Sequence, residues 1–141
     1  MQLRPGTVGQ HMTRDVVAIH AHESLLAAHD LMRSHRVRHL PVIERGELVG
    51  VISLRDLILV EGLPGVDERR VTVADAMTHH PYSVPPEADL GEVVRELSER
   101  RLGSAVVVEK GAVAGIFTTV DALRAFSRFL AEPRTDPAHV R

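Results

Sequence analysis

The sequence predicts an α+β fold in which two β-α-β-β-α repeats pack sheet against sheet about a pseudo-twofold axis. The chain matches itself without a gap when residues 7–59 are laid over residues 72–124, an offset of 65 residues (72 − 7 = 65). Within each copy, strand-like and helix-like hydrophobic patterns follow one another in the same order. Because one copy of about 60 residues buries too little apolar surface to be comfortable alone, we expect the two copies to pack on each other.

The two copies share identical residues throughout this register, and most of the remaining pairs exchange one apolar residue for another. A duplication explains this agreement better than chance. Every element can therefore be predicted twice, once from each copy. The identical pairs are Thr7/Thr72, Val8/Val73, Met12/Met77, Thr13/Thr78, Leu25/Leu90, Val42/Val107, Glu44/Glu109, Gly46/Gly111, Gly50/Gly115 and Asp56/Asp121.

Each copy opens with a short strand and a helix. The run VVAI at 16–19 is typical of a short strand. Ser24 stands where a helix N-cap belongs, and its counterpart Asp89 is another preferred N-cap residue. The apolar residues that follow are spaced as on one face of a helix, so we expect that face to point into the core. They are Leu25, Ala28 and Met32 in the first copy and Leu90, Val93 and Leu97 in the second.

A hairpin and a second helix complete each copy. HLPVIE and SAVVVE predict buried strands, RGE and KGA predict turns, and LVGVIS and VAGIFT predict the strands that pair with them. The last helix is expected to begin at Ser53 in one copy and at Thr118 in the other. In the first copy this helix carries LILV at 57–60, which is apolar in every direction. Such a run predicts burial on more than one side, either under the following linker or against another molecule.

The repeat also sets the domain organisation. The first repeat spans 7–60 and the second spans 72–130. Between them, 61–71 is a linker with the glycine, proline and charged residues of an exposed connection. Residues 131–141 form a polar tail. Both repeats together make one domain.

Composition excludes several classes of protein. A net charge of −2 offers no excess of positive charge for nucleic acid or an anionic membrane. The absence of cysteine excludes disulfides and thiolate chemistry. No segment approaches the roughly 20 apolar residues of a membrane span, and no serine lies in a nucleophile-elbow pattern. We expect a cytoplasmic protein that is not an enzyme and has no nucleic-acid or membrane partner.

Nine histidines are many for this length and raise the question of a metal site. His20 and His22 alternate, His35 and His39 are one helical turn apart, and His79 is followed by a further histidine. None of these spacings matches a known zinc site. We expect solvated histidines and no metal, with pH sensing or phosphate contact ranking next.

The stretches GVISLRD and GIFTTVD share glycine, a hydroxyl residue and aspartate at the same spacing. One interpretation is helix capping, with Ser53 or Thr118 as the N-cap and Asp56 or Asp121 at the third helical position. The other is a ligand site. The glycine would let a ligand approach the backbone, a helix N-terminus favours phosphate, and a carboxylate can accept two ribose hydroxyls. The same residues can do both.

The chain resembles a tandem pair of CBS (cystathionine beta-synthase) domains, also called a Bateman module. Each copy opens with Val-x-x-x-Met-Thr (VGQHMT, VADAMT), passes through RHLPVIE or GSAVVVE, and closes with Gly-x-x-Ser/Thr-x-x-Asp. The resemblance runs from Thr7 to about Phe126. It implies a regulatory module that binds AMP, ADP or ATP, and sometimes NAD or S-adenosylmethionine, in the clefts between the repeats. It also implies pairing into a flat, disc-like homodimer.

The same resemblance implies a role for particular residues. Asp56 and Asp121 would accept the ribose hydroxyls. The phosphate contacts would be Ser53, Arg55, Thr118 and Thr119. The adenine slot would be lined by Val17, Ala18, Arg38, His39, Leu40, Pro41, Tyr82, Ser83 and Ala105, of which the apolar members would serve equally well as ordinary core.

The two predicted sites are expected to differ. Arg55 would face a phosphate as a fork of donors, whereas its counterpart is Val120. The first site should therefore favour more phosphate. Val106 stands where the first copy has Pro41, which departs from the family pattern in the second base pocket.

We therefore expect a stand-alone module that binds an adenine nucleotide as a regulatory ligand and signals to a separate effector protein. The alternative is a ligand-independent interaction scaffold in which the motifs only cap helices. Arg55 opposes that alternative, because a helix N-terminus disfavours positive charge. A histidine-based metal sensor, or a sensor of S-adenosylmethionine or NAD, ranks lower.

Overall fold

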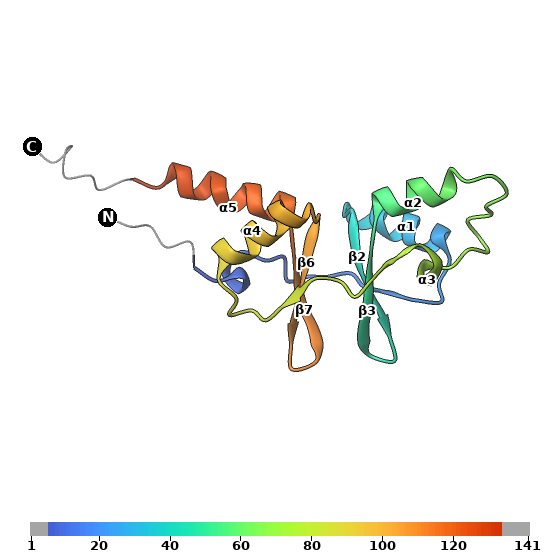
Figure 1. The fold of residues 1–141 in the computed structure, drawn as a ribbon, viewed down its shortest axis with the longest axis horizontal. Helices are drawn as coiled ribbons and strands as arrows, with labels where there is room; N and C mark the ends of the chain where they lie inside the picture. Colours follow the sequence, from blue (N-terminus) through green and yellow to red (C-terminus); the bar gives the residue numbers. More distant parts are fainter. Residues whose placement is uncertain (1–5, 134–141) are drawn as a thin grey trace, which may run out of the picture.

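The computed structural model describes residues 6–133, which form two sheets with helices packed against them (Figure 1). The first sheet has the order β1-β2-β3-β4 and the second the order β5-β6-β7. The first consists of β1 (Ile19–His20), β2 (His39–Glu44), β3 (Glu47–Ser53) and β4 (Thr78–His79), and the second of β5 (Ser83–Val84), β6 (Ser104–Glu109) and β7 (Ala112–Thr118). The predicted α+β fold of two sheet-and-helix repeats is confirmed.

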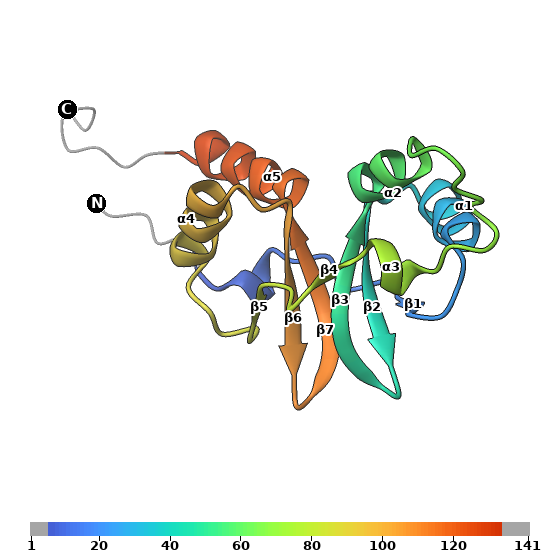
Figure 2. The same ribbon diagram turned by 45° about the vertical axis from the view of Figure 1, so that its right-hand side comes forward.

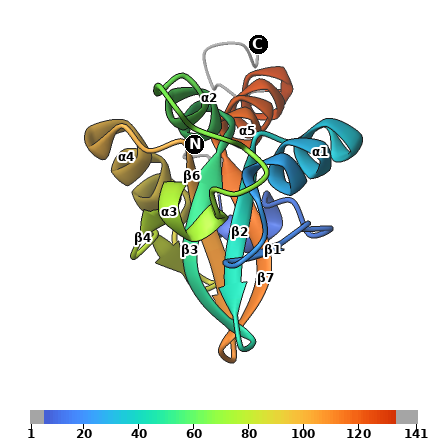
Figure 3. The same cartoon turned by 90° about the vertical axis from the view of Figure 1, so that its right-hand side faces the viewer.

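The helices follow the predicted order. After a short 3-10 turn, η1 (Val8–Gln10), they are α1 (Leu25–His35), α2 (Leu54–Glu61), α3 (Val73–Ala76), α4 (Leu90–Arg100) and α5 (Thr119–Ala131). Figure 3 shows α1, α2, α4 and α5 gathered at one end of the molecule and the two hairpin turns at the other. The helices α2 and α5 directly follow β3 and β7, so both begin at the same end of the sheets (Figure 2).

The two hairpins are built alike. Arg45 and Gly46 both have positive φ, as do Lys110 and Gly111. Two consecutive residues of positive φ make the tight turn that matches the twist of paired strands, and glycine at the second position adopts it without strain. Each hairpin also has a register shift at the same place, after Val42 in one and after the equivalent valine in the other.

The predicted caps and apolar helix faces are confirmed. Ser24 Oγ accepts a hydrogen bond from the Ala27 amide at 3.1 Å, and an Asp89 carboxylate oxygen accepts one from the Glu92 amide at 3.0 Å. The apolar residues predicted to face inward on α1 and α4 are all buried. Since a cap satisfies amides that the helix itself cannot, the sequence correctly located both helix starts.

The first strand is shorter than predicted. It comprises Ile19 and His20, which pair in parallel with Val42 and Ile43, and not the whole run 16–19. The Val16 amide donates to the Arg14 carbonyl within its own segment at 2.9 Å. Val16 thus bonds within a local turn and not to β2, so the valine-rich composition did not decide the strand here.

The core has two clusters, and each includes a residue from the opening segment of the other repeat. Val8 packs in the cluster around Leu90, Val93 and Phe117, and its amide donates to the Ala88 carbonyl at 2.8 Å. Its counterpart Val73 packs in the cluster of the first repeat. The two packing units are therefore joined by exchanged segments, and they are not the units that the sequence repeat delimits.

The two sheets lie beside each other, with β7 in contact with both β2 and β3 (Figure 2). Pro41 and Val106 are buried, but they alternate with the residues that face the helices, as strand geometry requires. These two side chains therefore point toward the space between the sheets. This contact relates the two repeats by the predicted pseudo-twofold arrangement.

The connection between the repeats is partly anchored. The helix α2 continues through Glu61. The Leu25 and Leu26 amides then donate to the carbonyls of Val71 and Glu68, each at 3.0 Å. At the other end, α5 runs to Ala131, and residues 134–141 of the predicted tail lie outside the described residues.

The apolar run at 57–60 is only half buried. Leu57 is fully buried and Val60 packs against the core, whereas Ile58 is 57% exposed and Leu59 is 61% exposed. The linker therefore does not cover this helix completely. No described helix is both long enough and apolar enough to cross a membrane.

Candidate functional site

Both Gly-x-x-Ser/Thr-x-x-Asp motifs form helix-capping boxes. Ser53 Oγ accepts from the Asp56 amide at 3.1 Å, and the Ser53 amide donates to Asp56 Oδ2 at 2.9 Å. In the second motif Thr118 and Asp121 make the same pair of bonds, at 3.3 and 2.9 Å. The capping interpretation is confirmed, and it brings each aspartate to the first turn of a helix, as a ribose site would also require.

The motif glycines have a structural explanation. A Cβ atom on Gly50 would lie 2.5 Å from Met77 Sδ and 2.8 Å from the Thr78 carbonyl oxygen. Gly115 has the same two conflicts with Met12 and Thr13. The glycines make room for the segment that crosses from the other repeat. The expectation that they leave room for a ligand is wrong, because a methionine already occupies that space.

The first motif leaves few free donors at the start of α2. The Leu54 amide donates to the Arg38 carbonyl at 2.8 Å, and the amides of Ser53 and Asp56 bond within the capping box. Among the described residues only the Arg55 amide of this turn has no acceptor. The Arg55 side chain is exposed and makes no ion pair within residues 6–133. One amide and one guanidinium therefore remain for an anion.

Asp56 is half-buried, and its carboxylate is only partly used. Oδ2 accepts from the Ser53 amide, and no other described residue donates to either oxygen. Oδ1 is thus an acceptor available to a hydroxyl donor. A ribose with vicinal hydroxyls is the kind of group that such a carboxylate binds through charge-assisted hydrogen bonds.

His39 lies beside this carboxylate and between the repeats. It pairs with Ser53 across the β2–β3 hairpin. A Cβ atom on Gly103 of the second repeat would lie 2.6 Å from His39 Nε2. Burial lowers the pKa of His39, the charge of Asp56 raises it, and Arg38 lowers it. Burial dominates, so the imidazole is held neutral and is able both to donate and to accept.

The second motif is occupied by the protein's own donors. Asp121 is 3% exposed. Its Oδ2 accepts from the Thr118 amide and hydroxyl, at 2.9 and 3.2 Å. Its Oδ1 accepts from the Thr13 hydroxyl at 3.0 Å and from an Arg124 guanidinium nitrogen at 3.1 Å. Thr118 and Asp121 are thus together as predicted, but their carboxylate is saturated.

Sequence reasoning missed Thr13, Arg124 and Gly103. The signal for Arg124 was present, because its repeat counterpart is Leu59 and the exchange places a cation three residues after the motif aspartate. Thr13 has an identical counterpart in Thr78, so nothing in the sequence distinguished the two.

The predicted adenine residues do not form a single group. Leu40 and Ala105 are fully buried within the two core clusters. Val17 and Ala18 are half-buried before β1, and Ser83 is exposed. The Tyr82 ring lies 5.3 Å from the Arg100 guanidinium carbon, in a cation–π contact. Of the predicted phosphate contacts in the second motif, Thr119 is exposed, and its amide donates to the Gly103 carbonyl at 3.1 Å.

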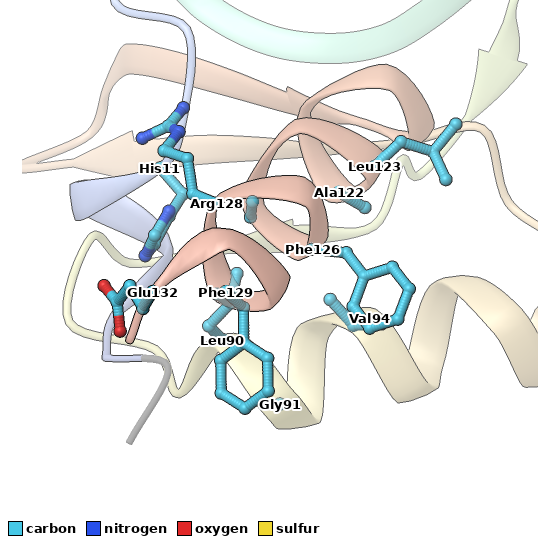
Figure 4. Close-up of a pocket in the computed structure, with 11 residues that line it drawn as sticks. His11, Leu90, Gly91, Val94, Ala122, Leu123, Phe126, Arg128, Phe129 and Glu132 are labelled. Atoms are coloured by element: carbon cyan, nitrogen blue, oxygen red, sulfur yellow. The ribbon is translucent and has the colours of Figure 1, made fainter. Parts of the chain in front are cut away.

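A groove of about 660 Å³ lies elsewhere, on the outer face of the second repeat between α4 and α5 (Figure 4). Leu90, Val94 and Phe126 are among the residues that line it, with Arg128 and Glu132 near one end. None of the predicted nucleotide contacts is among its lining residues. Its walls are mainly apolar, which suits another apolar surface better than a phosphate.

Two sheet-and-helix repeats with exchanged segments and twin capping motifs define a tandem-repeat module. The family model described as "CBS domain" matches residues 8–61 and again 73–128. The chain belongs to the CBS domain family and carries a pair of these domains.

Two curated relatives show the range of proteins that contain this pair. The chain is 32% identical over 109 residues to inosine-5'-monophosphate dehydrogenase of Korarchaeum cryptofilum, and the match covers 77% of this chain but 22% of that enzyme. It is 26% identical over 114 residues to hypoxic response protein 1 of Mycobacterium tuberculosis, and covers 80% of both chains. The similarity to the dehydrogenase thus concerns a small part of its length.

Three solved structures have the same fold. CBSX2 in complex with AMP has a TM-score of 0.77 and 28% identity, covering 89% of this chain and 98% of that one. The CBS domain of a bacterial CNNM/CorC Mg2+ transporter in complex with ATP has a TM-score of 0.76 and 30% identity, covering 88% and 89%. Hypoxic Response Protein I with two coordinated zinc ions has a TM-score of 0.73 and 25% identity, covering 84% and 97%.

Proposed function

We propose that this protein is a regulatory module that binds an adenosine-containing nucleotide of the AMP, ADP and ATP class between its two CBS repeats and signals to a separate partner. The observation that carries the proposal is the half-buried Asp56 carboxylate at the start of α2, with Oδ1 open to a hydroxyl donor and Arg55 one residue away.

The surroundings of Asp56 suit the parts of such a ligand. The ribose hydroxyls would donate to Oδ1, and the phosphates would meet the Arg55 amide and guanidinium. His39, held neutral by burial, would face the ligand from the side of the second repeat. A nucleotide in this position touches both repeats, so its binding would favour one relative arrangement of the two over others.

The solved relatives support this ligand class. CBSX2 was solved with AMP and the CNNM/CorC domain with ATP, so the same fold holds adenine nucleotides of different phosphate number. A metal sensor is supported less well. Hypoxic Response Protein I has two coordinated zinc ions, but within residues 6–133 of this chain no group of three or more histidine, aspartate or glutamate residues is placed to hold a metal ion.

A thermal-shift panel tests the proposal, using AMP, ADP, ATP, NAD, S-adenosylmethionine and zinc on protein stripped of bound ligand. Ligand at about 100 times its dissociation constant adds roughly 2.7 kcal/mol of stability, which moves the midpoint by several degrees. We expect a shift with one or more adenine nucleotides that is lost in Asp56→Asn. The matched control is Asp75→Asn, because Asp75 occupies the same capping-box position at α3. No shift with any nucleotide would contradict the proposal.

We also propose that the protein forms a homodimer through the α4–α5 face. Leu123, Phe126 and Leu130 on α5 are all more than half exposed, and the first two line the apolar groove of Figure 4. A contiguous apolar patch of this kind marks an interaction site. Sedimentation of Phe126→Glu should then show monomer where the unmodified protein shows dimer. Leu63→Glu, which changes an equally exposed apolar residue outside this face, should leave the dimer intact.

A further inference from the structure

The two motif aspartates differ in the number of donors that reach them. From the described residues, Asp121 accepts four hydrogen bonds, donated by Thr13, Thr118 and Arg124 to both carboxylate oxygens. Asp56 accepts one from them, donated by the Ser53 amide. The two motifs have the same local structure, because each aspartate follows an equivalent strand and closes the capping box of an equivalent helix.

Two residues cause this difference. Arg124 lies one turn after Asp121 and reaches Oδ1 at 3.1 Å, whereas its counterpart Leu59 has no donor. Thr13 belongs to the opening segment of the first repeat and pairs through its backbone with Ile116, with amide-to-carbonyl distances of 2.8 and 3.0 Å. Its hydroxyl donates to Asp121. Among the described residues, Thr78 in the equivalent place makes no such bond to Asp56.

A ribose could bind Asp121 only by replacing donors that are already in place. The carboxylate is 3% exposed, and a hydroxyl pair would have to displace both the Arg124 guanidinium and the Thr13 hydroxyl from Oδ1. The first carboxylate imposes no such exchange. A ribose placed in the same way at both aspartates is therefore expected to bind Asp121 more weakly than Asp56. Only at Asp121 must it displace hydrogen-bond donors of the protein.

We infer that Asp121 is a closed carboxylate, which clamps the N-terminal segment onto α5 through Thr13 and Arg124, and that the module takes one adenine nucleotide, at Asp56. This inference rests on the proposed function for the ligand, but the clamp itself does not depend on any ligand. Arg124 and Thr13 are then the residues that decide how many nucleotides the pair of repeats accepts.

Removing the two outside donors from Asp121, and adding one to Asp56, tests the number of sites. Isothermal titration with ATP, and separately with AMP, should give one equivalent per chain for the unmodified protein. The double variant Thr13→Val, Arg124→Leu removes both donors and should give two equivalents. The reciprocal variant Leu59→Arg places a guanidinium where it reaches Asp56 and should weaken the single site about tenfold or more, the equivalent of one displaced charge-assisted bond.

The outcomes separate this inference from the proposed function. Two equivalents bound by the unmodified protein would overturn the closed second site and leave the nucleotide proposal standing. One equivalent that survives Asp56→Asn but is lost in Asp121→Asn would place the nucleotide at the wrong motif and also overturn it. If no variant binds a nucleotide, the proposed function is wrong. Whether Asp121 clamps the N-terminal segment is then tested by a measurement without ligand.

Hydrogen exchange provides that measurement. Asp121→Asn should accelerate exchange of the Thr13 amide about tenfold, because the clamp that holds its segment is weakened. Asp56→Asn should leave the equivalent amide of Thr78 unchanged within error. Equal acceleration at both positions, or none at Thr13, would show that Asp121 holds nothing that Asp56 does not, and would overturn the inference.

Discussion

The two repeats place an aspartate at the same position of the same capping box, yet the two carboxylates have different surroundings. Within residues 6–133, Oδ1 of Asp56 accepts no hydrogen bond, and it lies near His39 and near Arg55, which makes no ion pair with these residues. Around Asp121 every acceptor is used within the protein. The motif itself sets the helix start in both copies, whereas residues outside the motif decide whether its carboxylate is available. A Gly-x-x-Ser/Thr-x-x-Asp pattern therefore locates a helix cap with certainty and a ligand site only after its neighbours are known.

The largest expected difference in stability between the two repeats appears when each motif carboxylate is removed in turn. Asp121→Ala removes the carboxylate half of its capping box and leaves the Thr13 hydroxyl and the Thr118 donors without an acceptor in a buried place, so we expect a loss of about 2–4 kcal/mol in the free energy of unfolding. Asp56→Ala removes only the carboxylate half of its capping box, about 1 kcal/mol. Urea denaturation of both variants measures the difference. Equal losses would contradict the unequal roles of the two residues.

Much of the fold could be predicted because both repeats contain the same pattern of residue types. The caps at Ser24 and Asp89, the hairpins and the apolar helix faces depend on local residue types, and each copy checked the other. The first strand was placed too early because its pairing depends on where the chain turns after Arg14, which β-branched composition does not encode.

The candidate site was less predictable, because its decisive contacts join residues far apart in sequence. Thr13 and Asp121 are 108 residues apart, and the contact of His39 with Gly103 crosses between the repeats. Such contacts follow from the exchange of segments, which no local pattern reveals. The motif glycines were misinterpreted for the same reason, since the methionine that each one accommodates comes from the opening segment of the other repeat.

Alanine substitutions at the two motif glycines are expected to cost the same stability. Gly50→Ala and Gly115→Ala each place a methyl group 2.8 Å from a carbonyl oxygen and against a methionine. Overpacking of this kind costs typically 1–3 kcal/mol. Because the conflicts are the same in both copies, the two variants should lose similar stability in urea denaturation. A harmless Gly50→Ala beside a damaging Gly115→Ala would show that the exchanged segments are not equivalent.

His39 gives the first site a pH dependence that the second lacks, since its counterpart is Ser104. In the folded protein, burial lowers the pKa of His39 below its ordinary value of 6.5. The unfolded chain therefore binds the proton more readily than the folded protein does. Stability is then lost as the pH falls through about 6.5 towards the folded pKa, with a slope below about 1.4 kcal/mol per pH unit. Unfolding free energies at several pH values should show this slope, and His39→Gln should flatten it. An unchanged slope in the variant would assign the effect to other histidines.

The smallest expected change in stability is at Arg55. An exposed cation in the first turn of a helix opposes the dipole by roughly 0.3–1 kcal/mol, so Arg55→Val, which installs the residue of the second motif, should leave stability unchanged or raise it by a few tenths of a kcal/mol. The same variant should weaken ATP binding more than AMP binding, because the guanidinium meets additional phosphate. Titration of both nucleotides against the variant and the unmodified protein measures the ratio. If the variant weakens AMP and ATP binding equally, Arg55 does not contact the distal phosphates. If the variant is less stable than the unmodified protein, Arg55 supports the fold as well as the ligand.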